Sequence, residues 1–456
     1  MDILKKRESG YKSIKKEELK SIYLFCDKYM DFLNNYITER EVHEFIIQKL
    51  EDSGFLNIEE VDSLDIGDKV YFSNKKKAVY ALIVGEDIES GLSIVGSHID
   101  SPRIDLKPNP LYESNHLALF KTHYYGGIKK YQWTTIPMSL HGIVVKTNGE
   151  TVDINVGEKD SDPVFTITDL LPHLAQEQED KKVSKAIEGE DLNVLVGSMP
   201  NSNDSVKDNI MKLINEKYDI VEEDFTSAEL ELVPAFKARS LGFDKSMISS
   251  YGQDDRACVY TSLMGIIKSK GTNRTKVAIF ADKEEVGSMG NTGMCSDSFD
   301  YFLGEVLNKL NLNDLNMLHK IYNNSMMLSA DVGVGVDPNY DSVSEKGNAS
   351  YIGYGLDVNK YTGVKGKFGG SDANAEFVAK VRNIFEENDI KYQISELGKV
   401  DLGGGGTIAY ILANKGIEVL DCGIPVISMH SPYEVTSKFD IYEAYKAYKA
   451  FFEYDE

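Results

Sequence analysis

The first hundred residues show a change in the spacing of apolar side chains. Residues 17–35 carry apolar side chains close to a helical spacing, at Leu19, Ile22, Phe25 and Phe32 among others, with lysines and acids between them. This pattern predicts an amphipathic helix, and residues 40–50 predict a second one. Continuous apolar runs, typical of buried strands, follow at 69–72, 78–84 and 92–96.

The middle of the chain has a different pattern of apolar and polar residues. Residues 104–234 read as short strands, turns and charge-rich pieces, and the polar stretches 176–185 and 201–208 predict loops. After Pro234 the pattern returns to alternating helices and strands. The expected helices are 256–268, 299–310, 372–387, 407–415 and 441–454, and the expected strands are 276–281, 325–330 and 419–423.

Alternation of this kind is typical of a mostly parallel sheet covered by helices. We therefore predict one α/β domain formed by residues 1–103 and 236–456, interrupted by a β-rich insertion at 104–235. A chain of 456 residues with 42% apolar residues is long enough for such an organisation.

The negative net charge of the chain disfavours some classes of binding partner. The formal charge of -23 argues against nucleic acid or an anionic membrane as the main partner. The first residues, Met1 to Glu8, lack the apolar region of a signal peptide, and no run of 18 apolar residues occurs. The four cysteines contain no C-x-x-C pair, which argues against a thiolate zinc site and a disulfide framework. We expect a soluble cytoplasmic protein with reduced cysteines.

Acidic and histidine residues follow several of the predicted strands. In α/β sheets, ligands bind at the carboxyl ends of the strands. The residues at such ends are His98 with Asp100, the pair Glu284 and Glu285, Asp331, and His430, while Asp254 and Asp255 lie in a turn before a predicted helix.

Each of these residues also has a structural interpretation. A single histidine after a strand is commonly a hydrogen-bonded structural residue, and Asp254 or Asp255 could cap the following helix. The adjacent Glu284 and Glu285 fit a structural role least well, because burying an unpaired carboxylate costs several kcal/mol. Together, two histidines and several carboxylates are the ligands of a paired divalent site for Zn, Mn or Co.

His98 and Asp100 have a further relationship. Residues two apart on an extended chain face the same side, so the carboxylate of Asp100 is expected to accept from the second ring nitrogen of His98. Such a contact fixes the tautomer of a histidine that binds a metal.

Five short motifs carry a resemblance to a known family. Residues 96–102 (GSHIDSP), 253–256 (QDDR), 282–288 (DKEEVGS), 329–332 (SADV) and 429–432 (MHSP) occur in the order seen in the aspartyl aminopeptidase family. That family includes the vacuolar aminopeptidase I type, and its members are co-catalytic metallo-aminopeptidases. The resemblance covers nearly the whole chain and implies a three-layer αβα metallopeptidase domain.

The resemblance also implies a role for each motif residue. One metal would be held by His98, Asp254 and Asp331, and the other by Asp254, Glu285 and His430, with Glu284 as the general base. The first acid of the Asp254–Asp255 pair matches the bridging position of the family, although either acid could bridge the metals. The insertion resembles a dimerisation domain whose histidine, here His173, enters the neighbouring subunit's active site. Family members assemble as dodecamers.

Two glycine-rich stretches complete the candidate site. Acid-specific members carry an Arg-Tyr pair where this chain has residues 365–372 (KGKFGGSD). Lys365 or Lys367 could supply a positive charge for an acidic substrate side chain, or both could be solvated loop lysines, so the sequence leaves a preference for N-terminal Asp or Glu open. Residues 403–407 (GGGGT) could form a phosphate-binding loop, but the Lys-Ser/Thr of a P-loop is missing. The resemblance instead implies that Gly404 and Gly405 are active-site backbone near the substrate.

We therefore predict a metal-dependent aminopeptidase that acts on short peptides and assembles from dimers, as a dodecamer by resemblance. A di-metal deacylase of small N-acyl compounds would use the same ligands. A catalytically silent, self-assembling scaffold is the alternative from another class, and the presence of Glu284 argues against it.

Overall fold

The computed structural model describes residues 7–203, 205–271, 273–312, 314 and 316–455. The chain divides into two compact units. Unit 1 comprises the described residues of 1–100, 238–429 and 434–456, and unit 2 comprises those of 101–237 and 430–433. Among the described residues, no helix combines the length and the apolar composition needed to cross a membrane.

Unit 1 is built around a mixed sheet of nine strands in its described residues, of which most neighbours are parallel. In order across the sheet, the strands are β1 (Leu56–Asn57), β2 (Lys69–Asn74), β3 (Ala78–Ile83), β14 (Thr275–Ala281), β4 (Leu92–His98), β15 (Met326–Ser329), β21 (Glu418–Gly423), β17 (Leu356–Asn359) and β19 (Tyr392–Ser395).

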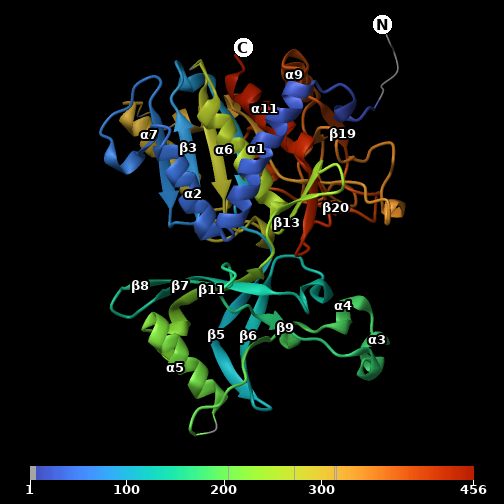
Figure 1. Ribbon diagram of the computed structural model, residues 1–456. Helices are drawn as coiled ribbons and strands as arrows, with labels where there is room; N and C mark the ends of the chain where they lie inside the picture. The colour runs from blue at the N-terminus through green and yellow to red at the C-terminus, as the bar shows by residue number, and fades with distance from the viewer. Residues whose placement is uncertain (1–6, 204, 272, 313, 315, 456) are drawn as a thin grey trace. The chain divides into compact units, whose positions relative to one another are not determined.

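Helices cover both faces of this sheet (Figure 1). Successive residues of β3 alternate between two separate cores, because side chains along a strand point to opposite faces. Val79 and Ala81 belong to the core shared with one set of helices, and Tyr80 and Leu82 belong to the other. The first set is α1 (Lys16–Asn35), α2 (Glu39–Glu51), α6 (Gln253–Lys268), α9 (Ala375–Glu387) and α11 (Lys438–Glu453), and the second is α7 (Ser298–Lys309), α8 (Met317–Asn324) and α10 (Ala409–Ala413).

Two smaller sheets complete unit 1. A five-stranded sheet has the order β12 (Arg239–Leu241), β13 (Met247–Ser250), β23 (Glu434–Ser437), β22 (Pro425–Ile427) and β16 (Gly333–Val334), and β18 (Gly363–Val364) pairs with β20 (Gly404–Gly405). The predicted α/β class with a mixed, mostly parallel sheet is confirmed.

Unit 2 contains an antiparallel sheet of seven strands in its described residues. Their order is β8 (Thr151–Val156), β7 (Met138–Val145), β11 (Ala228–Pro234), β5 (Arg103–Ser114), β6 (Leu117–Tyr125), β10 (Val194–Gly197) and β9 (Thr166–Ile167). The polar stretch 176–185, expected as a loop, includes the short helices α3 (Gln176–Glu179) and α4 (Val183–Ala186).

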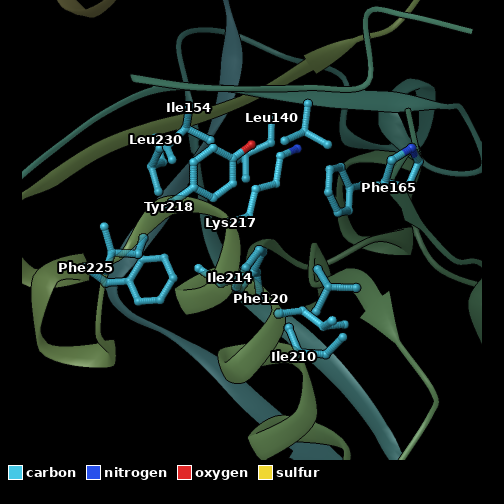
Figure 2. A pocket seen from close by; sticks show the side chains of 15 residues that line it. Phe120, Leu140, Ile154, Phe165, Ile210, Ile214, Lys217, Tyr218, Phe225 and Leu230 are labelled. Atoms are coloured by element: carbon cyan, nitrogen blue, oxygen red, sulfur yellow. The ribbon is translucent and has the colours of Figure 1, made fainter. Parts of the chain in front are cut away.

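Helix α5 (Val206–Tyr218) was not predicted from the sequence. Its apolar side chains line a groove against the sheet of unit 2 (Figure 2). The helix begins inside the stretch 201–208, which we expected to be a loop. The Ser205 side chain caps it by accepting a hydrogen bond from the backbone N–H of Asp208 at 3.1 Å. A serine followed three residues later by an acid is a helix-start signal that the polarity of this stretch obscured.

Candidate metal centre

His98 ends strand β4 with both ring nitrogens in polar surroundings. Its Nδ1 lies 3.0 Å from the carbonyl oxygen of Asp100 and 3.3 Å from the Asp100 carboxylate. Both of these oxygens can only accept, so Nδ1 carries a proton, and Nε2 is the ring nitrogen that faces the other carboxylates. The backbone N–H of His98 donates to the Asp255 carboxylate at 3.2 Å, which further fixes the end of the strand.

Carboxylates gather around Nε2 of His98. The nearest oxygens of Asp254, Asp331 and Glu284 lie 3.3, 3.8 and 3.9 Å from this nitrogen. Three groups of ligand atoms each lie within 4.8 Å of one another: His98 with Glu284 and Asp331, His98 with Asp254 and Glu285, and Asp254 with Asp255 and Asp331.

The topology of unit 1 explains why these residues meet. Strands β14, β4 and β15 are adjacent and parallel, so their carboxyl ends lie at one edge of the sheet. Glu284 and Asp331 follow β14 and β15 along the chain. Asp254 and Asp255 have non-helical backbone angles at the start of α6, which packs against β4.

Glu284 and Glu285 are held through their backbone. The two carboxylate oxygens of Asp100 accept hydrogen bonds from the N–H groups of Glu284 and Glu285, at 3.1 and 3.2 Å. The chain forms a short 3₁₀ turn at Glu284–Val286 and leaves it at Gly287, whose φ of 90° suits glycine. Asp100 therefore contacts both the histidine and the two glutamates.

The crowded acids raise one another's affinity for protons. Burial and the nearby charge of Asp331 raise the pKa of Glu284 to about 8, and burial raises the pKa of Asp255 well above its usual range. Burial alone would lower the pKa of His98, but contacts with Asp100, Asp254 and Asp331 outweigh it and raise that pKa. Divalent cations would relieve this repulsion, and the donor set of imidazole and carboxylates suits them. The residues fit a metal centre.

Glu434 supports the centre and was not anticipated from the sequence. Its carboxylate accepts from the backbone N–H of Asp254 at 3.1 Å, and its carbonyl oxygen accepts from the side chain of Gln253 at 2.8 Å. Glu434 is buried on strand β23. Only its position shortly after the motif at 429–432 could have drawn attention to it.

The buried Asp421 is a second residue that sequence reasoning missed. Its carboxylate accepts a hydrogen bond from the Thr407 hydroxyl at 2.5 Å, and burial raises its pKa to about 7. Asp421 pairs in register with Ser329, two residues before Asp331. Thr407 ends the glycine stretch in which Gly404 and Gly405 form strand β20, so this stretch is tied to the strand beside Asp331. The expected substrate role of the two glycines stays a prediction.

The side chain of Lys367 is paired within the chain. Its ammonium donates to the Asp372 carboxylate at 2.7 Å and lies 3.9 Å from the centre of the Tyr361 ring. The charge that the sequence offered for an acidic substrate side chain is thus already paired within the chain. Its role in substrate binding stays a prediction.

The two remaining predicted residues belong to unit 2. His173 is exposed in the short 3₁₀ turn Pro172–Leu174. His430 lies with its Nδ1 2.8 Å from the carbonyl oxygen of Gly127. Their expected roles, in a neighbouring active site and as a metal ligand, stay predictions.

A buried histidine among carboxylates at the carboxyl edge of a parallel sheet is typical of metal-dependent hydrolases. Comparison with known proteins defines the class further. The profile described as aminopeptidase I zinc metalloprotease (M18) matches residues 32–452. The chain belongs to the M18 family and is a zinc aminopeptidase, a hydrolase acting on peptides. The family resemblance carried by the five motifs is confirmed.

Relatives match the chain along its length. A probable M18 family aminopeptidase 1 from Clostridium acetobutylicum is 50% identical over 97% of both chains. The crystal structure of aminopeptidase I from the same organism superposes with a TM-score of 0.92 at 49% identity, covering 99% of this chain and 100% of that one. The crystal structure of an M18 aminopeptidase from Thermotoga maritima gives a TM-score of 0.96 at 44% identity, with the same coverage. The dodecamer structure of mApe1 from S. cerevisiae, at 20% identity and a TM-score of 0.77 over 95% of this chain and 97% of that one, shares the fold.

Proposed function

We propose that the enzyme removes the N-terminal residue of short peptides at a two-metal centre, with Glu284 as the general base. The observation that carries this proposal is the cluster around His98, where oxygens of Asp254, Asp331 and Glu284 lie within 3.9 Å of Nε2. His98, Asp254 and Asp331 would hold one ion, and Asp254 with Glu285 would hold the other. The expected contribution of His430 to the second ion is part of the proposal.

A pair of divalent ions, zinc by family, supplies two effects when bound: polarisation of the scissile carbonyl and acidification of a water molecule. The carboxylate of Glu284 accepts a proton from the attacking water and later delivers it to the leaving amine. Asp100 fixes the orientation of Glu284 through its backbone N–H and that of His98 through Nδ1. These contacts hold the base and the metal ligand at fixed positions before substrate arrives.

Single substitutions of Glu284 and Glu285 distinguish the proposed general base from the proposed metal ligand. Glu284→Gln is expected to retain two metal ions per chain and lose activity by about 10²–10⁴-fold. Glu285→Gln is expected to lose metal as well as activity, and Glu376→Gln on α9 is the matched control that changes neither. Metal content by elemental analysis and hydrolysis of aminoacyl p-nitroanilides measure both effects. A Glu284→Gln enzyme that cleaves as fast as wild type contradicts the proposed base.

A second experiment determines which N-terminal side chains the enzyme prefers and which metal makes it active. Metal-stripped enzyme, reloaded with Zn, Mn or Co in turn, is assayed on aminoacyl p-nitroanilides with acidic, basic and apolar side chains. Because Lys367 is paired with Asp372, we expect no strong preference for acidic residues. N-acetyl amino acids are included, and activity on the acetylated compounds alone would identify a deacylase instead.

Assembly is the remaining part of the proposal. The solved structure of mApe1 from S. cerevisiae is a dodecamer. We infer a homo-oligomer for this chain, built from dimers through unit 2 and reaching a dodecamer. Sedimentation analysis of the purified protein should give twelve times the mass of one chain. A monomeric mass at micromolar concentration would contradict the assembly and leave the chemistry untouched.

A further inference from the structure

The carboxylate of Glu284 depends on its backbone for its position. Its distance of 3.9 Å from Nε2 of His98 is too long for a hydrogen bond. Among the residues that the structure describes, no side chain donates a hydrogen bond to this carboxylate. The neighbouring Glu285 would be restrained by its bond to a metal ion, whereas the proposed base has no such restraint. The direction in which Glu284 points is therefore set by the loop that carries it.

That loop, residues 282–293, returns to its starting point. Asp282 and Gly293 pair as a parallel bridge, and the N–H of Ser288 donates to the carbonyl oxygen of Lys283 at 2.7 Å. A Cβ on Gly293 would lie 2.3 Å from the carbonyl oxygen of Ser288. Only glycine allows the two halves of the loop to approach this closely. The loop is thus closed across its base.

A buried hydrogen bond between two side chains joins the ends of the loop. The Thr292 hydroxyl donates to the Asp282 carboxylate at 2.5 Å, and both residues are only 2% exposed. Burial and the nearby charges of Asp100 and Glu39 raise the pKa of Asp282 to about 6, while the bond from Thr292 acts in the opposite direction. A buried carboxylate among other acids is costly to leave without a donor, so the Thr292 hydroxyl holds it in one orientation.

The hairpin of β2 and β3 restrains the second half of the loop. The side-chain amide of Asn74, at the end of β2, donates to the carbonyl oxygen of Asn291 at 2.9 Å. The tip of the loop is exposed, with Val286 and Met289 46% and 65% exposed. The position of Glu284 therefore depends on contacts at the base of the loop rather than at its tip.

We propose that Thr292 is a positioning residue for the general base. Its hydroxyl, acting through Asp282, holds the loop closed so that Glu284 faces His98 and the metal centre. This inference rests on the proposed function of Glu284. Because a bond to metal would restrain Glu285, loss of the Thr292 hydroxyl should affect proton transfer more than metal or substrate binding.

Substitutions of Thr292 test this role by kinetics. Thr292→Val keeps the shape of the side chain and removes its hydroxyl. We expect kcat on aminoacyl p-nitroanilides to fall by about 10- to 100-fold, with KM and the metal content unchanged. Thr292→Ser keeps the hydroxyl and should restore most of kcat. Thr275→Val is the matched control, because Thr275 is fully buried at the other end of β14 and accepts the N–H of Gly85 at 3.0 Å.

Hydrogen–deuterium exchange measures closure of the loop without substrate. The enzyme is compared with metal bound and after its removal by a chelator, using peptides that cover residues 283–291. Exchange should be faster in Thr292→Val than in wild type or Thr292→Ser, because amides that are hydrogen-bonded in the closed loop lose protection when it opens. The difference should be larger without metal, when no bond to Glu285 restrains the loop. Thr275→Val should leave this segment unchanged.

Several results would overturn the positioning role. These are unchanged exchange in Thr292→Val, loss of metal from that variant, or wild-type kcat in it while Glu284→Gln is inactive. Equal losses of kcat in Thr292→Val and Thr275→Val would indicate general destabilisation and have the same consequence. If Glu284→Gln itself cleaves as fast as wild type, the proposed base is wrong, and the exchange experiment alone decides whether Thr292 closes the loop.

Discussion

The Asp100 carboxylate accepts a hydrogen bond from the backbone N–H of Glu284 at 3.1 Å. Its second oxygen accepts from the next N–H, that of Glu285, while the same residue contacts Nδ1 of His98. The proposed base and two of the proposed metal ligands are therefore oriented by one side chain.

Replacing Asp100 should affect metal and catalysis together. Asp100→Asn keeps the size of the side chain but turns one acceptor oxygen into a donor that faces an N–H group. Loss of such supporting contacts at metal sites costs about 10–100-fold in affinity or activity. We expect kcat and zinc affinity both to fall by about that factor, measured by steady-state kinetics and competition with a chelating dye.

The control for Asp100 is another aspartate that accepts a backbone N–H. Asp87 accepts from Glu89 at 3.0 Å at the start of a short 3₁₀ turn. Asp87→Asn should change stability slightly and leave kcat unchanged. A fall in kcat of equal size in both variants would mean that Asp100 acts only through folding.

Metal removal should destabilise unit 1. Burial and the nearby charge of Asp331 raise the pKa of Glu284 to about 8; bound cations would compensate both effects, so the metal-free protein carries that cost. With free zinc at a hundred times its Kd, the metal adds about 3 kcal/mol to the free energy of unfolding. Thermal unfolding with and without a chelator measures this difference. His98→Ala should remove most of it, and an undiminished effect in that variant contradicts the assigned site.

Thr407→Val tests the contact with Asp421. The substitution preserves shape but removes the Thr407 hydroxyl from the buried Asp421 carboxyl, at a cost of about 1–3 kcal/mol in unfolding free energy. If the glycine stretch contacts substrate, KM should rise more than kcat falls. Thr407→Ser keeps the hydroxyl and should restore KM. Equal behaviour of the serine and valine variants rules out the hydrogen bond as the cause.

His43 predicts a loss of stability in acid. Burial, with smaller contributions from Arg40 and Lys76, lowers the pKa of His43 to about 4. The unfolded chain binds this proton near pH 6.5, so it takes up more protons than the folded chain between pH 6.5 and 4. Stability is therefore full above pH 6.5 and falls by about 3 kcal/mol as the pH drops to 4. Denaturant unfolding across this range should show a shallower slope in His43→Gln, and an unchanged slope assigns the loss to other groups.

His173 can be tested by mixing subunits. Glu284→Gln and His173→Ala chains are each expected to be inactive alone. If His173 serves a neighbouring site, a random co-assembly contains intact sites formed between the two variants, about a quarter of the total for an isologous dimer. Activity is measured after the two chains are unfolded and refolded together. Mixing that restores no activity contradicts a role in trans.

Much of unit 1 could be predicted from the sequence because its elements follow strong local patterns. The helix expected at 441–454 and the strand expected at 276–281 correspond to α11 and β14, with no end displaced by more than three residues. Helix α6 begins three residues earlier than expected, because Asp254 and Asp255 form a non-helical first turn that carries their carboxylates into the cluster.

Contacts between distant residues could not be predicted in the same way. Glu434 is 180 residues from Asp254 along the chain, and neither residue type nor spacing indicates that they meet. The pairing of Asp421 with Thr407 likewise depends on how β21 lies in the sheet. Motifs identified the residues directly around the site, whereas the residues that support them are defined only by the fold.

The strand order of unit 1 determines when its sheet can be completed during translation. Strand β21, which begins at Glu418, lies inside the sheet between β15 and β17, and α11 packs against both α1 and α6. The ribosome must therefore release nearly the whole chain before this sheet is complete. The sheet of unit 2 requires no residue beyond Pro234. During translation, unit 2 can fold before the first hundred residues have all their sheet neighbours, and in that interval their apolar strands stay exposed to aggregation.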